Sequence, residues 1–353
     1  MIAISNVSSC QQTMKRRSSR SMLVRRRFGS IMDSAMGSTS ETRIGIVIPA
    51  FKSALTIEVT LDAVASQVHA AVAVIVVIDG PDPELEEIVR RHPSSPEVLV
   101  LPENSGGPAR PRNVGADRLR SRHDIEAVWF LDADDLPAPG FLGTMARLFD
   151  DHPKAAMVFS DFANWVDSSP RPDPAPPPSI PVSVEIELDW YLENTGAILP
   201  SYSVIRGDAL DRLRNDGGGF SPELSNNQDY ELFVRLIATS EARRIAWSGG
   251  AYRVHDAAIS SNRAMAWSCR SRADQMLATW FESRGSLEVA RRFIAKAGSA
   301  ARRANKELWH VGRRGEAARG LLWRTVGSLD PKAAVVLARL VLGVGDSPSK
   351  RGE

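Results

Sequence analysis

The feature that most constrains the fold is a repeated alternation of short β-branched apolar runs with segments of helical spacing. Residues 44–48 and 72–78 are continuously apolar, and further runs follow at 97–101 and 127–131. Unbroken apolar runs of this length suit strands of a parallel sheet that is buried on both faces. The alternation therefore predicts an α/β domain whose strands are joined by right-handed crossovers.

Between these runs, apolar residues recur at helical spacing, and Pro83 opens one such segment in the position that favours a helix start. The expected helices are a pattern through Leu55, Val59, Leu61, Val64 and Val68, then residues 83–91, 112–122 and 141–149.

The chain changes character after a strand predicted at 155–160. Residues 168–181 contain seven prolines, which excludes regular structure there. A smaller mixed half is expected from the runs at 197–205, 230–238, 244–247 and 251–254, followed by a mainly helical stretch at 265–342. The expected organisation is a tail at 1–40, an α/β domain at 41–262 and a helical C-terminal extension at 263–353.

Charge separates the tail from the rest of the chain. Residues 1–40 hold seven Lys and Arg against one Asp, whereas the remainder holds 37 bases and 41 acids. The body is thus mildly acidic, so nucleic acid is not an expected partner. The tail lacks apolar periodicity, and we expect it to be disordered or to precede the true start, with Met22, Met32 and Met36 as alternatives.

Cysteine content and hydropathy bear on the compartment. Cys10 and Cys269 cannot form a disulfide framework, which fits a reducing environment. No apolar stretch reaches the roughly 20 residues needed to span a bilayer. We expect a cytoplasmic protein, with peripheral contact at the inner face of the membrane as an open alternative.

Three carboxylates gather where one predicted strand ends, at Asp132, Asp134 and Asp135. Such a group repels itself unless a cation neutralises it, and Mg²⁺ or Mn²⁺ prefers these oxygen ligands. Open parallel sheets bind ligands at the carboxyl ends of their strands, so a metal-held diphosphate is the favoured interpretation. The alternative is that the acids only cap the helix after Pro139.

Another acid, Asp79, ends the second strand, where it could accept hydrogen bonds from a nucleobase, although Asp-Gly is also a common turn. Neither a G-x-G-x-x-G nor a G-x-x-x-x-G-K-[ST] sequence follows the first strand. A metal must therefore hold phosphate in place of a glycine-rich cradle.

Four segments together resemble the successive signatures of family 2 glycosyltransferases, and they stand in the family's order. They are Ile46-Val-Ile-Pro-Ala-Phe51, Val76-Val-Ile-Asp-Gly80, Arg112-Asn-Val-Gly115 and Phe130-Leu-Asp-Ala-Asp-Asp135. The resemblance covers roughly residues 43–260 and implies the GT-A fold, a Rossmann-like sandwich with a mainly parallel central sheet.

The resemblance also implies roles for individual residues. Asp79 would help hold the base, Asp132 would face nucleotide or metal, and Asp134 would coordinate the metal. The residues expected to bind the nucleotide sugar are Pro49, Ala50, Phe51, Asp79, Arg112, Asn113, Asp132 and Ala133. Pro81-Asp82-Pro83 departs from the family's usual turn, so the base contacts are not fixed by it.

Two later segments also fit the family. Asn226-Asn-Gln-Asp-Tyr230 resembles the segment that carries the catalytic base, with Gln228 in place of the first acid, which makes Asp229 the candidate base. Tyr252-Arg-Val-His255 resembles a segment whose His approaches the metal. The alternatives are that Asp229 is only a helix N-cap and that His255 is only solvated.

The expected function is transfer of a sugar from a nucleotide-diphosphate sugar to an acceptor hydroxyl with inversion. The acceptor could be a carbohydrate or a lipid-linked or other hydroxyl, in cell-surface polysaccharide or glycoconjugate synthesis. Divalent Mg²⁺ or Mn²⁺ is the expected cofactor, bound by Asp134, Asp132 and His255. Nucleotidyl transfer and a non-catalytic binding module are the alternatives, although the loop after the first strand lacks the glycines that nucleotidyl transfer would need.

Overall fold

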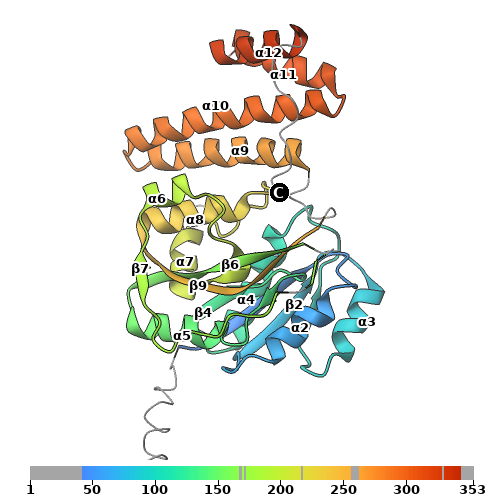
Figure 1. Ribbon diagram of the computed structural model, residues 1–353, viewed down its shortest axis with the longest axis vertical. Helices are drawn as coiled ribbons and strands as arrows, with labels where there is room; N and C mark the ends of the chain where they lie inside the picture. Colours follow the sequence, from blue (N-terminus) through green and yellow to red (C-terminus); the bar gives the residue numbers. More distant parts are fainter. Residues whose placement is uncertain are drawn as a thin grey trace, which may run out of the picture. The chain divides into compact units, whose positions relative to one another are not determined.

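The computed structural model describes residues 42–166, 169–170, 172–215, 218–255, 262–327 and 330–342 (Figure 1). The predicted disordered tail at 1–40 and Cys10 lie outside these residues. All of the described ranges belong to one compact unit, Thr42–Glu353.

Four parallel strands form the first half of a single sheet. They are β1 (Ile44–Ala50), β2 (Ala73–Ile78), β3 (Glu97–Val100) and β4 (Ala127–Phe130). In space their order is β3-β2-β1-β4, with each neighbouring pair parallel. The strands predicted from the apolar runs are confirmed within two residues at each end.

The helices that connect these strands are α2 (Ile57–Ala65), α3 (Pro83–Arg91) and α4 (Ala109–Arg122), and α5 (Phe141–Asp151) follows later in the chain. The pattern predicted for α2 is confirmed at Leu61 and Val64 but wrong at its two ends. Leu55 and Val68 lie outside the helix and are 95% and 86% exposed, whereas Ile57, Leu61 and Val64 face the core. Apolar residues in the flanking turns extended the apparent periodicity beyond the helix.

Helix α4 begins three residues earlier than predicted, at Ala109. Pro111, which precedes the predicted helix, lies in the first turn of α4. Amide groups of the first turn have no acceptor within the helix, so a proline there removes no hydrogen bond.

The second half of the sheet is mixed, as predicted, but it is continuous with the first half. Its strands are β8 (Ser203–Arg206), β6 (Ala155–Val166), β9 (Glu241–Val254), β5 (Leu136–Pro137) and β7 (Ser183–Glu185). Strand β8 pairs antiparallel with both β4 and β6. The separate runs predicted at 244–247 and 251–254 belong to the one long strand β9, because pairing with β6 continues across the polar and glycine residues between them.

Helices cover both faces of the sheet (Figure 1). Along β1, Ile46 and Ile48 join an apolar cluster with α2, α3 and α5, while Val47 joins a second cluster on the opposite face. The second cluster includes α4, α6 (Leu188–Glu193), α7 (Gly207–Asn215) and α8 (Gln228–Thr239). This alternation along a buried strand is the arrangement expected of an α/β sandwich.

The predicted helical extension comprises α9 (Arg263–Glu282), α10 (Leu287–His310), α11 (Arg314–Gly327) and α12 (Pro331–Leu342). Phe281 of α9 and Phe293 of α10 stack with ring centroids 5.3 Å apart. Both belong to the same apolar cluster as Tyr230 and Phe233 of α8. The extension therefore shares a core with the sandwich.

No helix within the described ranges is long and apolar enough to cross a membrane. The described part of the proline-rich segment has no regular structure, as predicted, except for a short bend near Ile180. Pro177 packs so closely on Gly140 that a Cβ there would lie 2.5 Å from the proline ring. The segment thus lies against the start of α5.

Candidate active site

Three neighbouring parallel strands end at the same edge of the sheet. Since β2, β1 and β4 are adjacent, the residues that follow them lie side by side at this edge. These are Asp79 after β2, Phe51 after β1 and Asp132 after β4. The structure thus brings together the strand-end residues that the sequence predicted as a group.

Asp132 is bound by a buried arginine. The Arg112 Nη2 donates to Asp132 Oδ1 over 2.5 Å, and the arginine side chain is only 2% exposed. The Asp132 amide donates to Ser201 Oγ, which comes from the 3₁₀ turn before β8. In the described part of the chain, Nε and Nη1 of Arg112 have no hydrogen-bond partner. A buried cation with two unused donors is suited to an anionic ligand.

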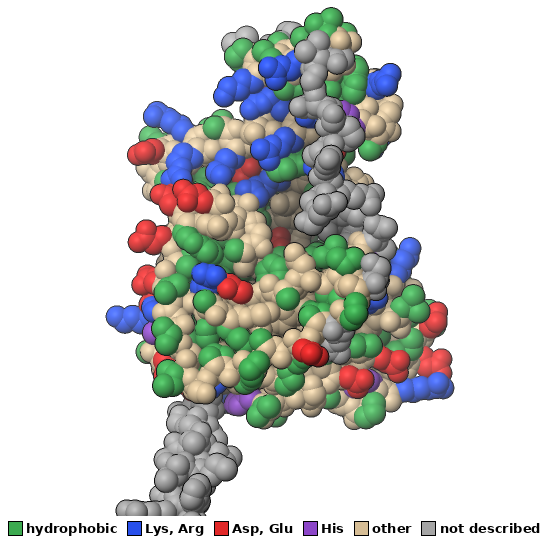
Figure 2. Space-filling view, viewed as in Figure 1, with side chains coloured by type: hydrophobic (Ala, Val, Ile, Leu, Met, Phe, Trp, Pro, Cys, Tyr) green, Lys and Arg blue, Asp and Glu red, His purple; other side chains and the backbone are tan. Residues whose placement is uncertain are grey.

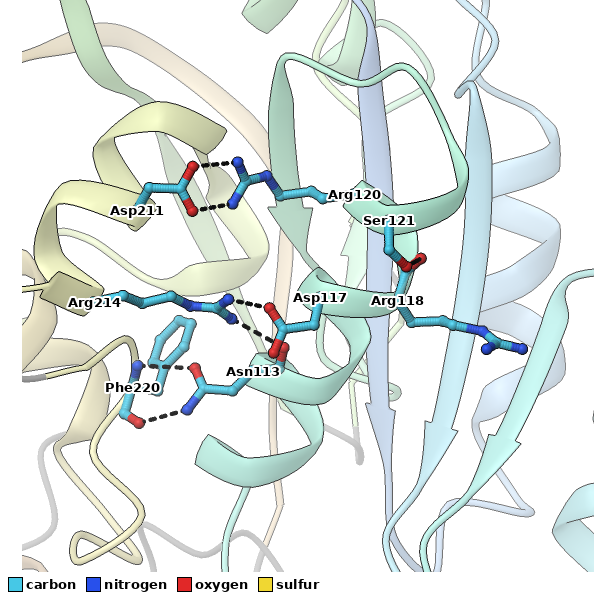
Figure 3. Close-up of polar contacts among 8 residues, drawn as sticks. All are labelled: Asn113, Asp117, Arg118, Arg120, Ser121, Asp211, Arg214 and Phe220. Carbon is cyan, nitrogen blue, oxygen red and sulfur yellow. Dashed lines mark hydrogen bonds and ion pairs between the residues drawn. The ribbon is translucent and has the colours of Figure 1, made fainter.

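The position of Arg112 depends on its neighbour Asn113. The Asn113 Nδ2 donates to the Phe220 carbonyl over 2.8 Å, and its Oδ1 accepts from the Phe220 amide over 3.0 Å (Figure 3). The Phe220 ring in turn lies 5.1 Å from the guanidinium of Arg112, a cation–π distance. Asn113, predicted to contact the donor, therefore holds the aromatic support of Arg112.

Ion pairs between α4 and α7 fix the helix that carries both residues. Arg120 forms two bonds to Asp211, and Arg214 pairs with Asp117 and donates to the Asn113 carbonyl (Figure 3). The Arg120 guanidinium holds the pKa of the Asp211 carboxyl below its ordinary value. These pairs are partly exposed, so they contribute little to the free energy of unfolding. Their main effect is to fix the position of α4 relative to α7.

Asp134 and His255, which the resemblance assigned to a metal, face each other. The distance from His255 Nε2 to Asp134 Oδ2 is 2.9 Å, which joins the turn after β4 to the end of β9. Burial raises the pKa of the Asp134 carboxyl, and the nearby charge of Asp132 raises it further, while the bond to His255 opposes both effects. A carboxylate and an imidazole are both side chains that can bind a divalent cation.

No group of three His, Cys, Asp or Glu is arranged to hold a metal within the described ranges. The predicted triad is incomplete because Asp132 points to Arg112. Asp134 still fits a divalent cation, since Mg²⁺ is commonly bound through one or two carboxylates and completes its shell with water and substrate phosphate. The His255 imidazole would suit a softer divalent ion better than Mg²⁺.

Asp135 has a structural position. It is 1% exposed, and its Oδ1 accepts the backbone amide of Arg253 over 3.0 Å. Burial raises the pKa of the Asp135 carboxyl well above its ordinary value, and the charges of Asp132 and Asp134 add to this. The carboxyl ties the acidic turn to β9. No residue of the acidic turn caps α5, whose N-cap is Gly140, so the capping alternative does not describe this turn.

Asp79 is buried beneath the neighbouring loop. Its Oδ1 accepts the Ser105 amide over 3.0 Å, and its Oδ2 accepts from Ser105 Oγ and Asn104 Nδ2 over 2.9 and 3.2 Å. Its carboxylate therefore fixes the conformation of residues 104–105. A nucleobase that contacted Asp79 would have to share the carboxylate with these loop residues.

The remaining predicted donor contacts differ in exposure. Pro49, Ala50 and Ala133 are buried, and the Ala50 carbonyl accepts the Asp79 amide. Phe51 is 52% exposed at the sheet edge, and the next residue, Lys52, has a φ of 52°. A left-handed conformation is costly for lysine, and such strain concentrates at functional sites. Phe51 is the one of these residues with an exposed ring, and the Lys52 Nζ lies 5.1 Å from the ring centroid.

Asp229 lies in the first turn of α8 and is partly buried. Asn227 occupies the N-cap position but makes no side-chain cap bond, whereas the Asp229 Oδ1 accepts the Tyr230 amide over 2.8 Å. The carboxylate therefore has the helix-start role of the alternative, although it lies within the first turn. Burial raises the pKa of the Asp229 carboxyl; the charge of Arg112 lowers it, and that of Asp132 raises it. Asp229 thus lies within electrostatic reach of both residues of the Arg112–Asp132 pair.

Sequence reasoning missed the support that α9 gives to this helix. The Tyr230 hydroxyl donates to Asp274 Oδ1 over 2.8 Å, and the Arg270 guanidinium lies 3.4 Å from the centroid of the tyrosine ring. Both partners come from α9, some 40 residues along the chain. Only the tertiary structure pairs them, because no local pattern in α9 marks Arg270 and Asp274 as different from other charged residues.

A family described as "Glycosyl transferase family 2" matches residues 45–214. The protein y4gI of Sinorhizobium fredii is 25% identical over 207 residues, which make up 57% of this chain and 21% of that protein. This chain therefore matches about one fifth of the length of that relative.

Solved structures of S. aureus TarS residues 1–349 share the fold. The complex with UDP-GlcNAc gives a TM-score of 0.55 at 17% identity, and a second structure gives 0.53 at 18%. In each case the match covers 86% of this chain and 92% of the other. Residues 45–214 of this chain thus match glycosyltransferase family 2, and the molecule has the GT-A fold that it shares with these structures.

Proposed function

We propose that this enzyme transfers a sugar from a nucleoside-diphosphate sugar to an acceptor hydroxyl with inversion at the anomeric carbon. The observation that carries the proposal is the position of Arg112. It binds Asp132 at the end of β4 and acts electrostatically on Asp229 at the start of α8. A donor-binding acid and a candidate base therefore share one site.

Donor binding would use the sheet edge. Phe51 presents an exposed ring that can stack on a base, and the loop fixed by Asp79 lies beside it. The unused donors of Arg112 would bind phosphate oxygens, since a guanidinium presents several donors in a fork that matches phosphate. The TarS complex with UDP-GlcNAc makes UDP-sugars the first donors to test.

Asp134 and His255 would hold the divalent metal. Such an ion neutralises charge that develops on a departing diphosphate. Asp132 was predicted to face nucleotide or metal, and its bond to Arg112 favours the nucleotide-facing role. The pairing is expected because the buried guanidinium needs a counter-charge of its own.

Asp229 would act as the general base. Its carboxylate takes the proton of the acceptor hydroxyl as that oxygen bonds to the anomeric carbon, and the bond from that carbon to the diphosphate oxygen breaks with its electron pair. A raised pKa makes the carboxylate a stronger base. Because base and diphosphate lie on opposite sides of the reacting carbon, the product is inverted.

The test of this role is Asp229→Asn. We expect donor binding, measured by titration calorimetry with Mg²⁺ or Mn²⁺, to stay within about threefold, while the rate of transfer falls by roughly 10²- to 10⁴-fold. Asp208→Asn on the exposed face of α7 is the matched control and should leave both unchanged. Full transfer activity in Asp229→Asn would refute the assignment.

The proposed biological setting is synthesis of cell-surface polysaccharide or glycoconjugate. The support is the enzyme class together with the family match. Transfer from a labelled donor to extracted glycans and to lipid-linked acceptors distinguishes the acceptor classes. Release of pyrophosphate from a nucleoside triphosphate would instead indicate nucleotidyl transfer.

A further inference from the structure

Charge is divided sharply between the two parts of the described chain. Residues 42–262 hold 19 Lys and Arg against 32 Asp and Glu, whereas residues 263–342 hold 16 against six. The helical extension is thus strongly basic, although the whole chain carries a formal charge of only +2. Figure 2 shows Lys and Arg side chains over the helices at the top, with Asp and Glu concentrated on the body below.

The last described helix, α12, exposes an apolar face. At about 100° per residue, Val335, Ala338, Val341 and Leu342 fall within an arc of about 120°. Val335, Val341 and Leu342 are 53%, 64% and 72% exposed, and Ala338 is exposed as well. Within the described part of this helix, only Ala333, on the other side, is fully buried.

Cations border this apolar arc. Lys332 and Arg339 are exposed. On the helical wheel both lie within about 60° of the edge of the arc that Val335 marks. On the preceding helix α11, Leu322 and Trp323 are 55% and 67% exposed, and Arg319 is exposed as well. Figure 2 shows hydrophobic and basic side chains gathered together over α11 and α12. We call the exposed residues of this region the α11–α12 surface. They are Arg319, Leu322, Trp323, Lys332, Val335, Ala338, Arg339, Val341 and Leu342.

We infer that the α11–α12 surface docks on an anionic lipid membrane. Apolar side chains bordered by Lys and Arg, with a tryptophan, form the pattern of a helix that lies in the membrane interface. Lys and Arg near an anionic leaflet each contribute attraction, and tryptophan prefers the level of the lipid headgroups. The enzyme would bind peripherally, and this inference is independent of its reaction.

A second copy of the chain is the competing occupant, since its acidic body complements the basic extension. The membrane is favoured because the surface is apolar at its centre and basic at its border. An acidic protein face would pair with the Lys and Arg side chains, but it would place charged groups against the apolar side chains of the arc.

The test is cosedimentation of the full chain with vesicles. We expect binding to vesicles of phosphatidylcholine and phosphatidylglycerol in equal parts, weak binding to phosphatidylcholine alone, and release at high salt. Lys332→Glu with Arg339→Glu should weaken binding at least tenfold, since each cation is worth roughly fivefold. Trp323→Ser should weaken binding both to the anionic vesicles and to vesicles of phosphatidylcholine alone.

All three positions are exposed, so the variants should fold, and circular dichroism checks this. Val68→Ser with Arg91→Glu, on exposed positions of the body, is the matched control and should bind as the parent does. Unchanged binding in the α11–α12 variants would overturn the inference and assign the lipid contact to the basic residues of 1–40. Self-association that these same variants abolish, without vesicle binding, would also overturn it, in favour of the second copy.

Discussion

At the scale of single residues, the site is organised by one buried arginine. Arg112 gives Asp132 a counter-charge and leaves two donors for a ligand. The same charge opposes the effect of burial on Asp229. One guanidinium therefore links the donor-binding edge of the sheet to the candidate base.

The arginine should not be replaceable by lysine. In Arg112→Lys the charge remains, but the planar fork that reaches both Asp132 and a ligand is lost. We expect donor affinity to fall roughly 10- to 100-fold, which corresponds to one or two charge-assisted hydrogen bonds. Titration calorimetry measures this, and Arg110→Lys on the same helix is the control. Unchanged affinity would remove Arg112 from the donor site.

The raised pKa of Asp229 predicts the pH dependence of transfer. Burial favours the protonated carboxyl, so the active carboxylate is lost as pH falls through a value above the ordinary pKa of about 4. We expect kcat to decline on the acid side with an apparent pKa raised in this way. A rate profile at saturating donor measures it. A profile flat down to the ordinary carboxyl range would contradict the proposed base.

At the scale of elements, the position of α8 depends on α9. Tyr230, adjacent to Asp229, bonds to Asp274 and lies against Arg270. Burial raises the pKa of the Asp274 carboxyl, with Arg270 and the tyrosine hydroxyl opposing the effect. The extension thus reaches the residue next to the candidate base.

Removing the tyrosine hydroxyl tests this coupling. Tyr230→Phe leaves Asp274 with one partner fewer, and we expect a loss of about 1–3 kcal/mol in the free energy of unfolding. The rate of transfer should fall more than donor affinity does, because the change displaces Asp229 and spares Arg112. Denaturant unfolding and steady-state kinetics measure the two effects. Equal loss of both, or of neither, would show that α9 does not position the base.

At the scale of the whole molecule, the sandwich and the first two extension helices share one apolar core. Phe281, Phe293 and Leu277 are buried in the same cluster as Phe233 and Val47. The boundary predicted at residue 262 therefore crosses a continuous core. By contrast, α11 and α12 bury few side chains, among them Ala317, Leu321 and Ala333.

Two truncations distinguish these parts. Removal of residues 263–353 exposes the core face of α8, and we expect insoluble or unfolded protein. Removal of residues 312–353 should leave a folded enzyme with donor affinity within about threefold of the parent, because α9 and α10 remain. Size-exclusion chromatography and calorimetry measure both. A soluble, active 1–262 fragment would show that the predicted domain folds alone.

Much of the fold could be predicted from the sequence because buried parallel strands have a local signature. The runs at 44–48 and 127–131 are apolar without interruption. A strand needs apolar residues at every position only when both faces of its sheet are covered. Helix ends were less predictable. Leu55 and Val68 carry the right residue type, but exposure depends on which neighbours cover a position, and the sequence does not state this.

The sequence by itself determined the α/β architecture and placed acids at the end of one strand, since both follow from local pattern. Tertiary structure decided how the acids divide their roles: Asp132 with Arg112, Asp134 with His255, and Asp135 with the Arg253 amide. Their partners come from α4, 20 residues before Asp132, and from the end of β9 and the residue after it, 118 and 121 residues farther along the chain. The physical reason is that a carboxylate's role depends on the charges and donors within a few ångströms, and only folding brings those together.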